Sequence, residues 1–230
     1  MNRKKKGIFI TATGTDIGKT YITALIIKKL RDNAINAGYY KAALSGANLK
    51  NRKLIPGDAE YVAAMSGISM PPEKLVSYIY EPPVSPHLAA KMEQYPIELD
   101  KIKADFQKIQ EQFEIVVAEG SGGIVCPLRM DNQRIMLTDV IKALQLPVLI
   151  VADAGLGTIN STVLTVEYAK SAGIEIKGIL LNQYEEKNPI HQDNHLQIET
   201  LTDIPIIAHV KQHDTNLKLD ITTLLQLCGN

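Results

Sequence analysis

The stretch ATGTDIGKT at residues 12–20 constrains this chain more than any other part of its sequence. It follows the apolar run GIFIT at residues 7–11 and leads into a segment whose apolar residues, including Ile22 and Leu25, share one helical face. This order predicts a buried strand, a glycine-containing turn and a helix that begins near Lys19. The backbone N–H groups of such a turn attract anions, as does the N-terminus of the helix. We therefore expect a phosphate-binding loop here.

The end of this loop carries the residue types that phosphate binding requires. Gly18 lets the backbone approach phosphate oxygens, the Lys19 ammonium can reach the β- and γ-phosphates, and the Thr20 hydroxyl suits Mg²⁺. The start departs from the general pattern G-x-x-x-x-G-K-[ST], which has glycine at the position of Thr13. Counting from Gly14 leaves one residue too few. A chance GKT at a helix start is the alternative, but the strand–loop–helix context argues against it.

Short apolar, β-branched runs recur along the chain and alternate with amphipathic segments. Such runs are typical of strands buried on both faces, and strands alternating with helices imply right-handed crossovers. The sequence therefore predicts an α/β fold, a mostly parallel sheet with helices on both faces, in a single domain spanning residues 1–230. The expected strands are residues 7–11, 39–44, 114–119, 147–153, 176–182 and 205–210.

Three further segments can be assigned from spacing and capping signals. Apolar residues between Leu99 and Phe113 alternate spacings of three and four, the strongest helical signal in the chain. Ser85 followed by Pro86 predicts the start of another helix. The polar residues 183–194 are expected to form a loop or a frayed helix start, with His191 and His195 as solvent-exposed helix residues.

Two predicted strands end in an acidic residue, as a site for magnesium and nucleotide requires. These residues are Glu119 and Asp153, and position alone does not choose between them. Glu119 is favoured because the glycine-rich residues 120–123 follow it, and their backbone can pass close to a ligand. Asp153 is interpreted as a cap for the next helix.

Lys41 and Asp58 each have two interpretations. A lysine within a buried run usually lies on an edge strand with its ammonium in solvent. Beside a phosphate site, Lys41 would instead supply positive charge to developing anions. Asp58, in the segment PGDAEY, is by default a helix N-cap.

The composition excludes several classes of protein. Lys and Arg together number 25, as do Asp and Glu, so no overall field favours nucleic acid or membranes. The basic residues 3–6 are expected to form a solvated chain start. Cys126 and Cys228 lie far apart in the sequence, and no apolar run reaches membrane-spanning length. We expect a soluble cytoplasmic protein without nucleic-acid or membrane partners.

Several motifs, taken in order, resemble those of the dethiobiotin synthetase family, P-loop NTPase-like enzymes of biotin biosynthesis. The family's phosphate loop is similar to G-T-D-T-x-V-G-K-T, one residue longer than the general pattern, and here reads A-T-G-T-D-I-G-K-T. Ala12 thus stands where the family has glycine. An alanine can serve there only if the residue has a negative φ or if there is room for its methyl group. The other matching segments are KAALSG at 41–46, Asp58, PPVSPHLA at 82–89, EGSGG at 119–123, LGTIN at 156–160 and Asn182.

The resemblance implies an ATP- and Mg²⁺-dependent ligase that closes the ureido ring of 7,8-diaminononanoate with CO₂ or bicarbonate-derived CO₂. In that chemistry, one substrate amine forms a carbamate, which attacks the γ-phosphate of ATP to give a carbamic–phosphoric anhydride. The second amine then closes the ring. Because the substrate supplies both nucleophiles, positioning and electrostatic stabilisation are expected to do most of the catalysis.

The resemblance also implies roles for individual residues. Lys19 and Lys41 are the expected catalytic residues, and Thr20, Asp58 and Glu119 the expected metal ligands. ATP is expected to contact Asp16, Ile17, Gly18, Lys19, Thr20, Tyr21, Asp58, Glu119, Gly120, Ser121, Gly122, Asn182, Gln183, Lys211 and Gln212. Substrate is expected to contact Thr15, Ser45, Gly157, Thr158, Ile159 and Asn160. In the family the segment matching 157–160 comes from the neighbouring subunit, which implies a homodimer with shared sites.

Three alternatives remain open. A partitioning or positioning ATPase of the same superfamily would carry a signature lysine where this chain has Gly14. A glutamine-dependent amidating synthetase would need a second domain with a cysteine nucleophile, and this length leaves no room for one. A non-catalytic homologue is supported only by the loss of glycine at Ala12.

Overall fold

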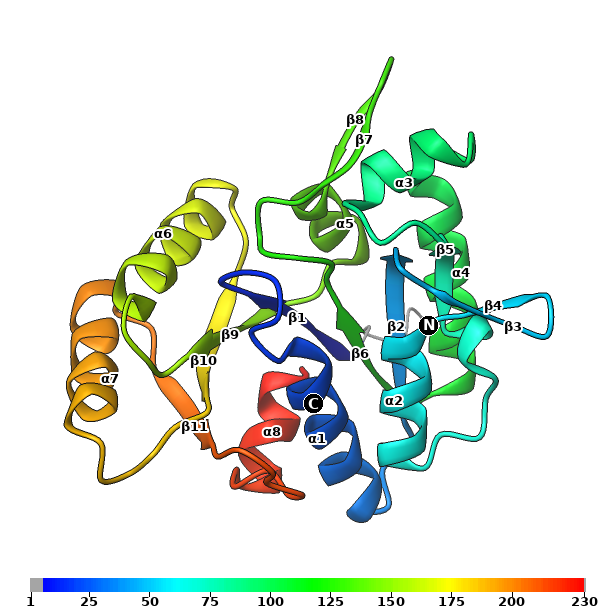
Figure 1. Cartoon of the computed structure of the whole chain (residues 1–230). Helices are drawn as coiled ribbons and strands as arrows, with labels where there is room; N and C mark the ends of the chain where they lie inside the picture. The colour runs from blue at the N-terminus through cyan, green and yellow to red at the C-terminus, as the bar shows by residue number, and fades with distance from the viewer. Residues whose placement is uncertain (1–5, 230) are drawn as a thin grey trace.

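A computed structural model describes residues 6–229, which form a seven-stranded parallel sheet with helices packed around it (Figure 1). The strand order is β11-β10-β9-β1-β6-β2-β5. All six pairings between neighbouring strands are parallel. The α/β prediction is confirmed. The strands are β1 (Gly7–Ala12), β2 (Ala37–Leu44), β5 (Val76–Ile79), β6 (Ile115–Glu119), β9 (Val148–Asp153), β10 (Ile176–Asn182) and β11 (Ile206–Val210).

The helices lie on both sides of the sheet, where α1 packs against α2, α4 against α5, and α6 against α7 (Figure 1). Their start signals agree with the sequence: α1 begins at Lys19, and α3 has Ser85 as its N-cap with Pro86 in its first turn. The helices are α1 (Lys19–Asp32), α2 (Gly57–Ser66), α3 (Pro86–Met92), α4 (Leu99–Gln112), α5 (Leu137–Leu144), α6 (Thr158–Ser171), α7 (Pro189–Thr202) and α8 (Ile221–Leu227), with a short 3₁₀ turn, η1 (Pro72–Lys74).

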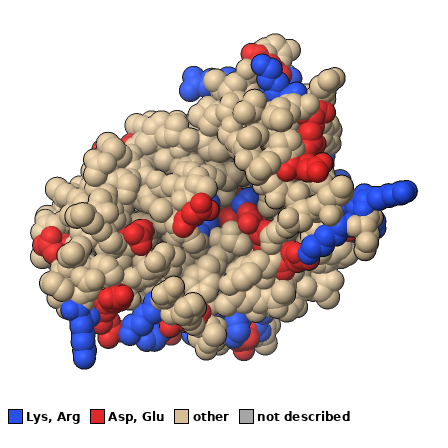
Figure 2. Space-filling view, in the orientation of Figure 1, with Lys and Arg blue, Asp and Glu red and all other residues tan. Residues whose placement is uncertain are grey.

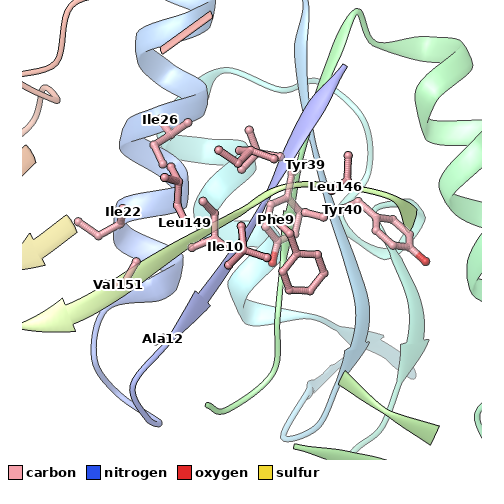
Figure 3. Close-up of a cluster of buried hydrophobic side chains, with 14 of the residues drawn as sticks. Phe9, Ile10, Ala12, Ile22, Ile26, Tyr39, Tyr40, Leu146, Leu149 and Val151 are labelled. Atoms are coloured by element: carbon pink, nitrogen blue, oxygen red, sulfur yellow. The ribbon is translucent and has the colours of Figure 1, made fainter. Parts of the chain in front are cut away.

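The centre of the sheet is apolar on both faces because helices cover each side. In β1, Ile8 and Ile10 are completely buried, as are Leu149 and Val151 of the adjacent strand β9. Figure 3 shows Ile22 and Ile26 of α1 packed beside these strands, with Phe9 and Tyr39 in the same cluster. This packing explains why the strands read as continuous apolar runs rather than as alternating ones.

The connections change direction between β1 and β6. The crossovers that leave β1 and β2 proceed toward β5, whereas those that leave β6, β9 and β10 proceed toward β11. In open α/β sheets, ligands bind outside the carboxyl ends of the strands at such a switch point. Thr11 and Ala12 therefore lead into the crevice from one side and Glu119 from the other.

Two small hairpins, one sheet strand and the helices α5 and α8 lie outside the sequence-based assignment. The hairpins are β3 (Asn48–Lys50) with β4 (Lys53–Ile55) and β7 (Pro127–Met130) with β8 (Arg134–Met136), and both project from the body in Figure 1. Strand β5, at one edge of the sheet, was not expected. Residues 183–188 form the expected loop, and α7 begins at Pro189. The basic run at 3–5 lies outside the described residues.

Candidate active site

The phosphate loop connects β1 to α1, and two of its residues adopt the left-handed backbone conformation. Within residues 12–20, positive φ occurs only at Asp16 (60°) and Gly18 (95°). Ala12 is the last residue of β1, fully buried and without a positive φ, so its methyl group is accommodated and the family glycine is not required there. The Lys19 ammonium donates to the Gly14 carbonyl oxygen at 3.0 Å and so folds back over the loop.

Gly18 is a position where a side chain would collide. A Cβ atom built there would lie 2.2 Å from the amide nitrogen of Asn182, at the end of β10. The same nitrogen donates to the Ile17 carbonyl oxygen at 2.9 Å. The loop is thus attached directly to the end of another strand, and glycine at residue 18 makes that approach possible.

Lys41 is the centre of a buried ionic cluster next to the loop. Its Nζ lies 2.5 Å from Asp58 Oδ2 and 2.8 Å from Glu119 Oε1. The Thr20 hydroxyl donates to the same Glu119 oxygen at 2.8 Å, and the Tyr39 hydroxyl donates to the other, Oε2, at 3.0 Å. Lys41 lies in β2, between β6 and β5, so the edge-strand interpretation is wrong and the phosphate-site interpretation matches its position.

The pKa shifts in this cluster follow from burial and from neighbouring charges. Burial alone lowers the pKa of Lys41, but attraction to Glu119 and Asp58 outweighs that effect and raises it. Burial lowers the pKa of Lys19, and repulsion by Lys41 adds to the shift. Burial raises the pKa of Tyr39 well above its ordinary value, and the Glu119 charge acts in the same direction. Tyr39 therefore remains a hydrogen-bond donor at neutral pH.

These groups open onto a cavity of about 580 Å³. Figure 2 shows basic and acidic side chains together at the bottom of a hollow near the centre of this face. The cavity brings together loop residues, both lysines and the expected metal ligands, and it adds Leu44 and Tyr61, which the sequence did not indicate. The lining residues are Thr15, Asp16, Gly18, Lys19, Thr20, Tyr21, Lys41, Leu44, Ser45, Asp58, Tyr61, Glu119, Ser121 and Gly122.

Asp58 and Asp153 do not have the capping roles that were their default interpretations. The N-cap of α2 is Pro56, and Asp58 lies in the first helical turn, where its carboxylate binds Lys41. The N-cap of α6 is Gly157, four residues beyond Asp153. Asp153 contributes only its carbonyl oxygen to that turn, accepting from the Thr158 hydroxyl at 2.6 Å. The capping predictions are wrong because α2 begins one residue before Asp58, and α6 begins only after a further turn beyond Asp153.

A second group of expected nucleotide contacts lies beyond the loop. Gln183, Lys211 and Gln212 line a separate cavity of about 430 Å³, at the ends of β10 and β11. Asn182 lies between the two cavities, and its Oδ1 is buried without a hydrogen-bond partner among the described residues. A buried acceptor without a partner is costly, and a ligand's donor would satisfy it.

The expected substrate contacts at 157–160 lie elsewhere. Gly157 is the N-cap of α6, and residues 158–160 form the first turn of that helix. None of these four residues lines the 580 Å³ cavity within the described chain. Leu156, immediately before them, is 94% exposed.

Tyr39 was not among the expected site residues, although its position in the strand indicates its role. Residues i and i+2 of a strand face the same side, so a residue two positions before Lys41 points toward the same cluster. Gly120 and Ser121 follow Glu119 as expected, and the Ser121 hydroxyl donates to the Ala43 carbonyl oxygen at 2.6 Å. That bond connects the loop after β6 to the end of β2.

The donor set fits magnesium better than transition metals. Glu119 and Asp58 supply carboxylate oxygens and Thr20 supplies a hydroxyl, the hard ligands that Mg²⁺ prefers. Within residues 6–229, no group of three or more His, Cys, Asp or Glu side chains could hold a metal by itself. Two carboxylates completed by substrate phosphates and water are a usual arrangement for Mg²⁺.

Known proteins similar to this chain include a domain family and close relatives of one enzyme family. A family model described as "AAA domain" matches residues 6–216. The chain is 50% identical over 221 residues to the ATP-dependent dethiobiotin synthetase BioD of Clostridium botulinum strain Alaska E43, covering 96% of this chain and 97% of the relative. The corresponding protein of strain Loch Maree is 51% identical with the same coverage.

Solved structures share the fold at much lower sequence identity. A ParA family ATPase from Chlorobium tepidum has a TM-score of 0.58 at 13% identity, over 98% of this chain and 91% of that one. The MinC:MinD cell division protein complex of Aquifex aeolicus has a TM-score of 0.57 at 15% identity, over 96% of this chain and 86% of that one. These likenesses show a common fold alone.

Within the described residues, no helix is long and apolar enough to cross a membrane.

Proposed function

We infer that this chain, which belongs to the ATP-dependent dethiobiotin synthetase family, closes the ureido ring of 7,8-diaminononanoate with CO₂ at the expense of ATP. The observation that carries the proposal is the convergence of Lys19, Lys41, Thr20 and Glu119 on one cavity beside the phosphate loop. That convergence supplies two ammonium groups at the place where two anions must meet.

The reaction is proposed to proceed in three steps. One substrate amine attacks CO₂ and loses a proton, which forms a carbamate. A carbamate oxygen then attacks the γ-phosphorus of ATP, ADP leaves, and a carbamic–phosphoric anhydride results. The second amine attacks the anhydride carbonyl carbon, phosphate leaves with the bonding electrons, and the ring closes as this amine loses one proton, so that each ring nitrogen keeps one N–H.

Lys19 and Lys41 are the proposed catalytic residues because both reactants of the second step are anionic. Two like charges about 4 Å apart repel by roughly 4 kcal/mol at an effective dielectric constant near 20. Positioned ammonium groups offset this repulsion as charge develops in the transition state. Without substrate, the positive charge of Lys41 is balanced by ion pairs with Asp58 and Glu119. We propose that Lys41 shifts one of its hydrogen bonds from these carboxylates to the carbamate when substrate is bound.

Mg²⁺ is proposed to bind to Thr20, Asp58 and Glu119. Bound there, it would supply positive charge to the phosphate oxygens. Asp16, Ile17, Gly18 and Tyr21 are proposed to contact ATP from the loop and the first turn of α1, and Gly120, Ser121 and Gly122 from the loop after β6.

The nucleoside is proposed to lie toward β10 and β11. The Oδ1 of Asn182, buried without a hydrogen-bond partner among the described residues, would accept a hydrogen bond from the adenine amino group, beside Gln183, Lys211 and Gln212. The diamine is proposed to contact Thr15 and Ser45 in the main cavity. Its carboxylate would meet residues 157–160 of a second copy of the chain, since those residues lie outside the main cavity of their own chain.

A homodimer with shared sites is therefore part of the proposal, as is the single-domain organisation over residues 1–230.

A cytoplasmic location is proposed because ATP and bicarbonate are available there, and because both cysteines are buried free thiols.

The experiment that tests the function measures ADP release by the purified protein with Mg-ATP and bicarbonate, with and without 7,8-diaminononanoate. The expected result is release that depends strictly on the diamine, with a product heavier by one carbonyl and lighter by two hydrogens. Release independent of the diamine but stimulated by DNA or membranes would instead favour a partitioning or positioning ATPase. That alternative is supported by the fold alone, and Gly14 stands where its signature lysine would be.

A further inference from the structure

Tyr21 connects the phosphate loop to the far side of the nucleotide site. It is the third residue of α1 and lines the main cavity. Its hydroxyl donates to the Asp214 carbonyl oxygen and lies 3.5 Å from the Lys211 carbonyl oxygen. Burial raises the pKa of Tyr21, as does the charge of Asp214, so the hydroxyl stays a donor at neutral pH.

The segment that receives this bond is a closed turn between β11 and α8. The Lys211 N–H donates to the Asp214 carboxylate at 2.9 Å, and the Asp214 N–H donates to the Lys211 carbonyl oxygen at 3.3 Å. Residues 211–214 therefore form one hydrogen-bonded unit. The same unit presents Lys211 and Gln212 to the 430 Å³ cavity.

Other attachments of this turn are weaker. The Lys211 ammonium pairs with Glu186 at 2.9 Å, but the two side chains are 42% and 65% exposed. Exposed pairs contribute little, and salt screens them. The Tyr21 hydroxyl links the turn itself to α1, the helix whose N-terminus faces the phosphates. The Lys28 ammonium of the same helix donates to Asn216 Oδ1 at 3.1 Å, two residues beyond the turn.

We propose that Tyr21 is a positioning residue for the nucleoside half of ATP, setting the distance between the phosphate loop and the wall of the base site formed by residues 211–214. This role rests on the proposed placement of the base at the ends of β10 and β11. Asn182 already anchors one wall of that site to the loop through the Ile17 carbonyl oxygen. Tyr21 anchors the wall formed by residues 211–214 through the Asp214 carbonyl oxygen.

The test compares wild type with Tyr21→Phe, which removes the hydroxyl and keeps the ring. Dissociation constants are measured calorimetrically with Mg²⁺ for three probes: ATP, ITP, which lacks the adenine amino group, and inorganic triphosphate, which lacks the nucleoside. ATP binding is expected to weaken roughly 3- to 10-fold, the range for loss of one hydrogen bond. Triphosphate binding is expected to change less than about 2-fold, and the preference for ATP over ITP is expected to fall.

Tyr95→Phe is the matched control. Tyr95 is 48% exposed in the connection between α3 and α4 and lies outside the lining of both cavities. The Tyr95→Phe substitution removes one tyrosine hydroxyl without changing the 211–214 turn. The dissociation constants for ATP, ITP and triphosphate should therefore match those of wild type.

A second variant keeps the proposal open to refutation if Tyr21→Phe folds poorly. Asp214→Ala opens the same turn from its other end, and it should lower ATP affinity in the same direction. The double variant should be no weaker than the worse single one, because both changes release one unit.

The outcomes separate this role from the proposed function. Unchanged ATP affinity in Tyr21→Phe, or equal weakening of ATP and triphosphate, would overturn the positioning role while leaving the synthetase proposal intact. Failure of the wild type to bind ATP at all would overturn both.

Discussion

The two ends of the candidate nucleotide site are built in different ways. At the ends of β1, β2 and β6, Lys41 and Glu119 are almost completely buried, and short hydrogen bonds connect them to Thr20 and Tyr39. At the ends of β10 and β11, the charged residues Glu186 and Lys211 are largely exposed on loops. Buried charges are strongly coupled and costly to disturb, whereas exposed pairs are weak and screened. We therefore expect substitutions to have large effects at the first end and small effects at the second.

The largest expected effect follows from removing the central cation. Lys41→Ala should lower kcat by about 10²- to 10³-fold or more, the range for loss of one positioned electrostatic group. It should also lower the free energy of unfolding by about 3 kcal/mol, because Glu119 is left buried without its counterion. The protein should remain folded. Turnover close to wild type in a steady-state assay would remove Lys41 from the mechanism.

The next effect distinguishes the two strand-end acids. Glu119→Gln should weaken Mg²⁺-dependent ATP binding by at least about 10- to 100-fold, since even groups one step removed from a metal cost this much. Asp153→Asn should change it by much less, because Asp153 lies outside the main cavity. ATP affinity measured against Mg²⁺ concentration gives the ranking. The reverse ranking would mean that the metal is held from β9.

An intermediate effect is expected at alkaline pH. The folded-state pKa of Tyr39 and that of Lys41 are both raised, so the folded chain binds more protons than the unfolded chain above about pH 10. Their stabilisation is present below the unfolded pKa values and is lost as pH rises through the folded ones. Each group contributes a slope of at most about 1.4 kcal/mol per pH unit, reached where it is protonated in the folded chain and deprotonated in the unfolded one.

Chemical denaturation between pH 9 and 11.5 measures this slope. Burial also raises the pKa of Tyr40 and of Tyr80, so those residues add to it. Tyr39→Phe removes one contribution, and its stability should therefore fall less steeply with pH than that of wild type. Parallel curves would show that Tyr39 does not titrate on unfolding in this range.

The smallest effect is expected at the exposed end. Glu186→Gln removes the partner of Lys211 and should change ATP affinity by less than about 3-fold, because exposed ion pairs contribute about 0–1 kcal/mol. Any effect should shrink further in 0.5 M salt, since screening weakens the pair that is lost. A salt-independent loss of 10-fold or more would show that this end is as tightly coupled as the other.

The parts of the fold that could be predicted from sequence are those with a local cause. The apolar run at 7–11 and the following GKT determine a strand, a loop and the start of α1, and all three lie as expected. Strand β5 was missed because it has only four residues, the shortest length at which alternation can be read, and its last two, Tyr78 and Ile79, are both apolar. His191 was expected to be exposed but is buried, with its Nδ1 accepting from the Glu185 N–H at 2.9 Å.

In the candidate site, too, the residues with a local sequence signal could be predicted, and the tertiary contacts could not. Lys19, Thr20 and Glu119 could be identified because each belongs to a recognisable segment that ends or begins an element. The ion pair of Lys41 with Asp58 could not, because it joins β2 to α2 through a tertiary contact that no spacing encodes. Strand order alone does not choose between the two acids, because β6 and β9 both lie next to β1. The choice follows from tertiary contacts, since Glu119 binds both Thr20 and Lys41.

The position of β1 in the middle of the sheet has a consequence for how the chain is made. Gly7 pairs with Val116 on one side, and Phe9 pairs with Val148 on the other. During synthesis from the N-terminus, the strand that carries the phosphate loop thus emerges first but acquires its last neighbour only once β9 has been made. Such distant pairing slows folding. A ribosome that stalls before Val148 would therefore hold a nascent chain whose nucleotide-binding segment is complete in sequence but not yet enclosed in the sheet.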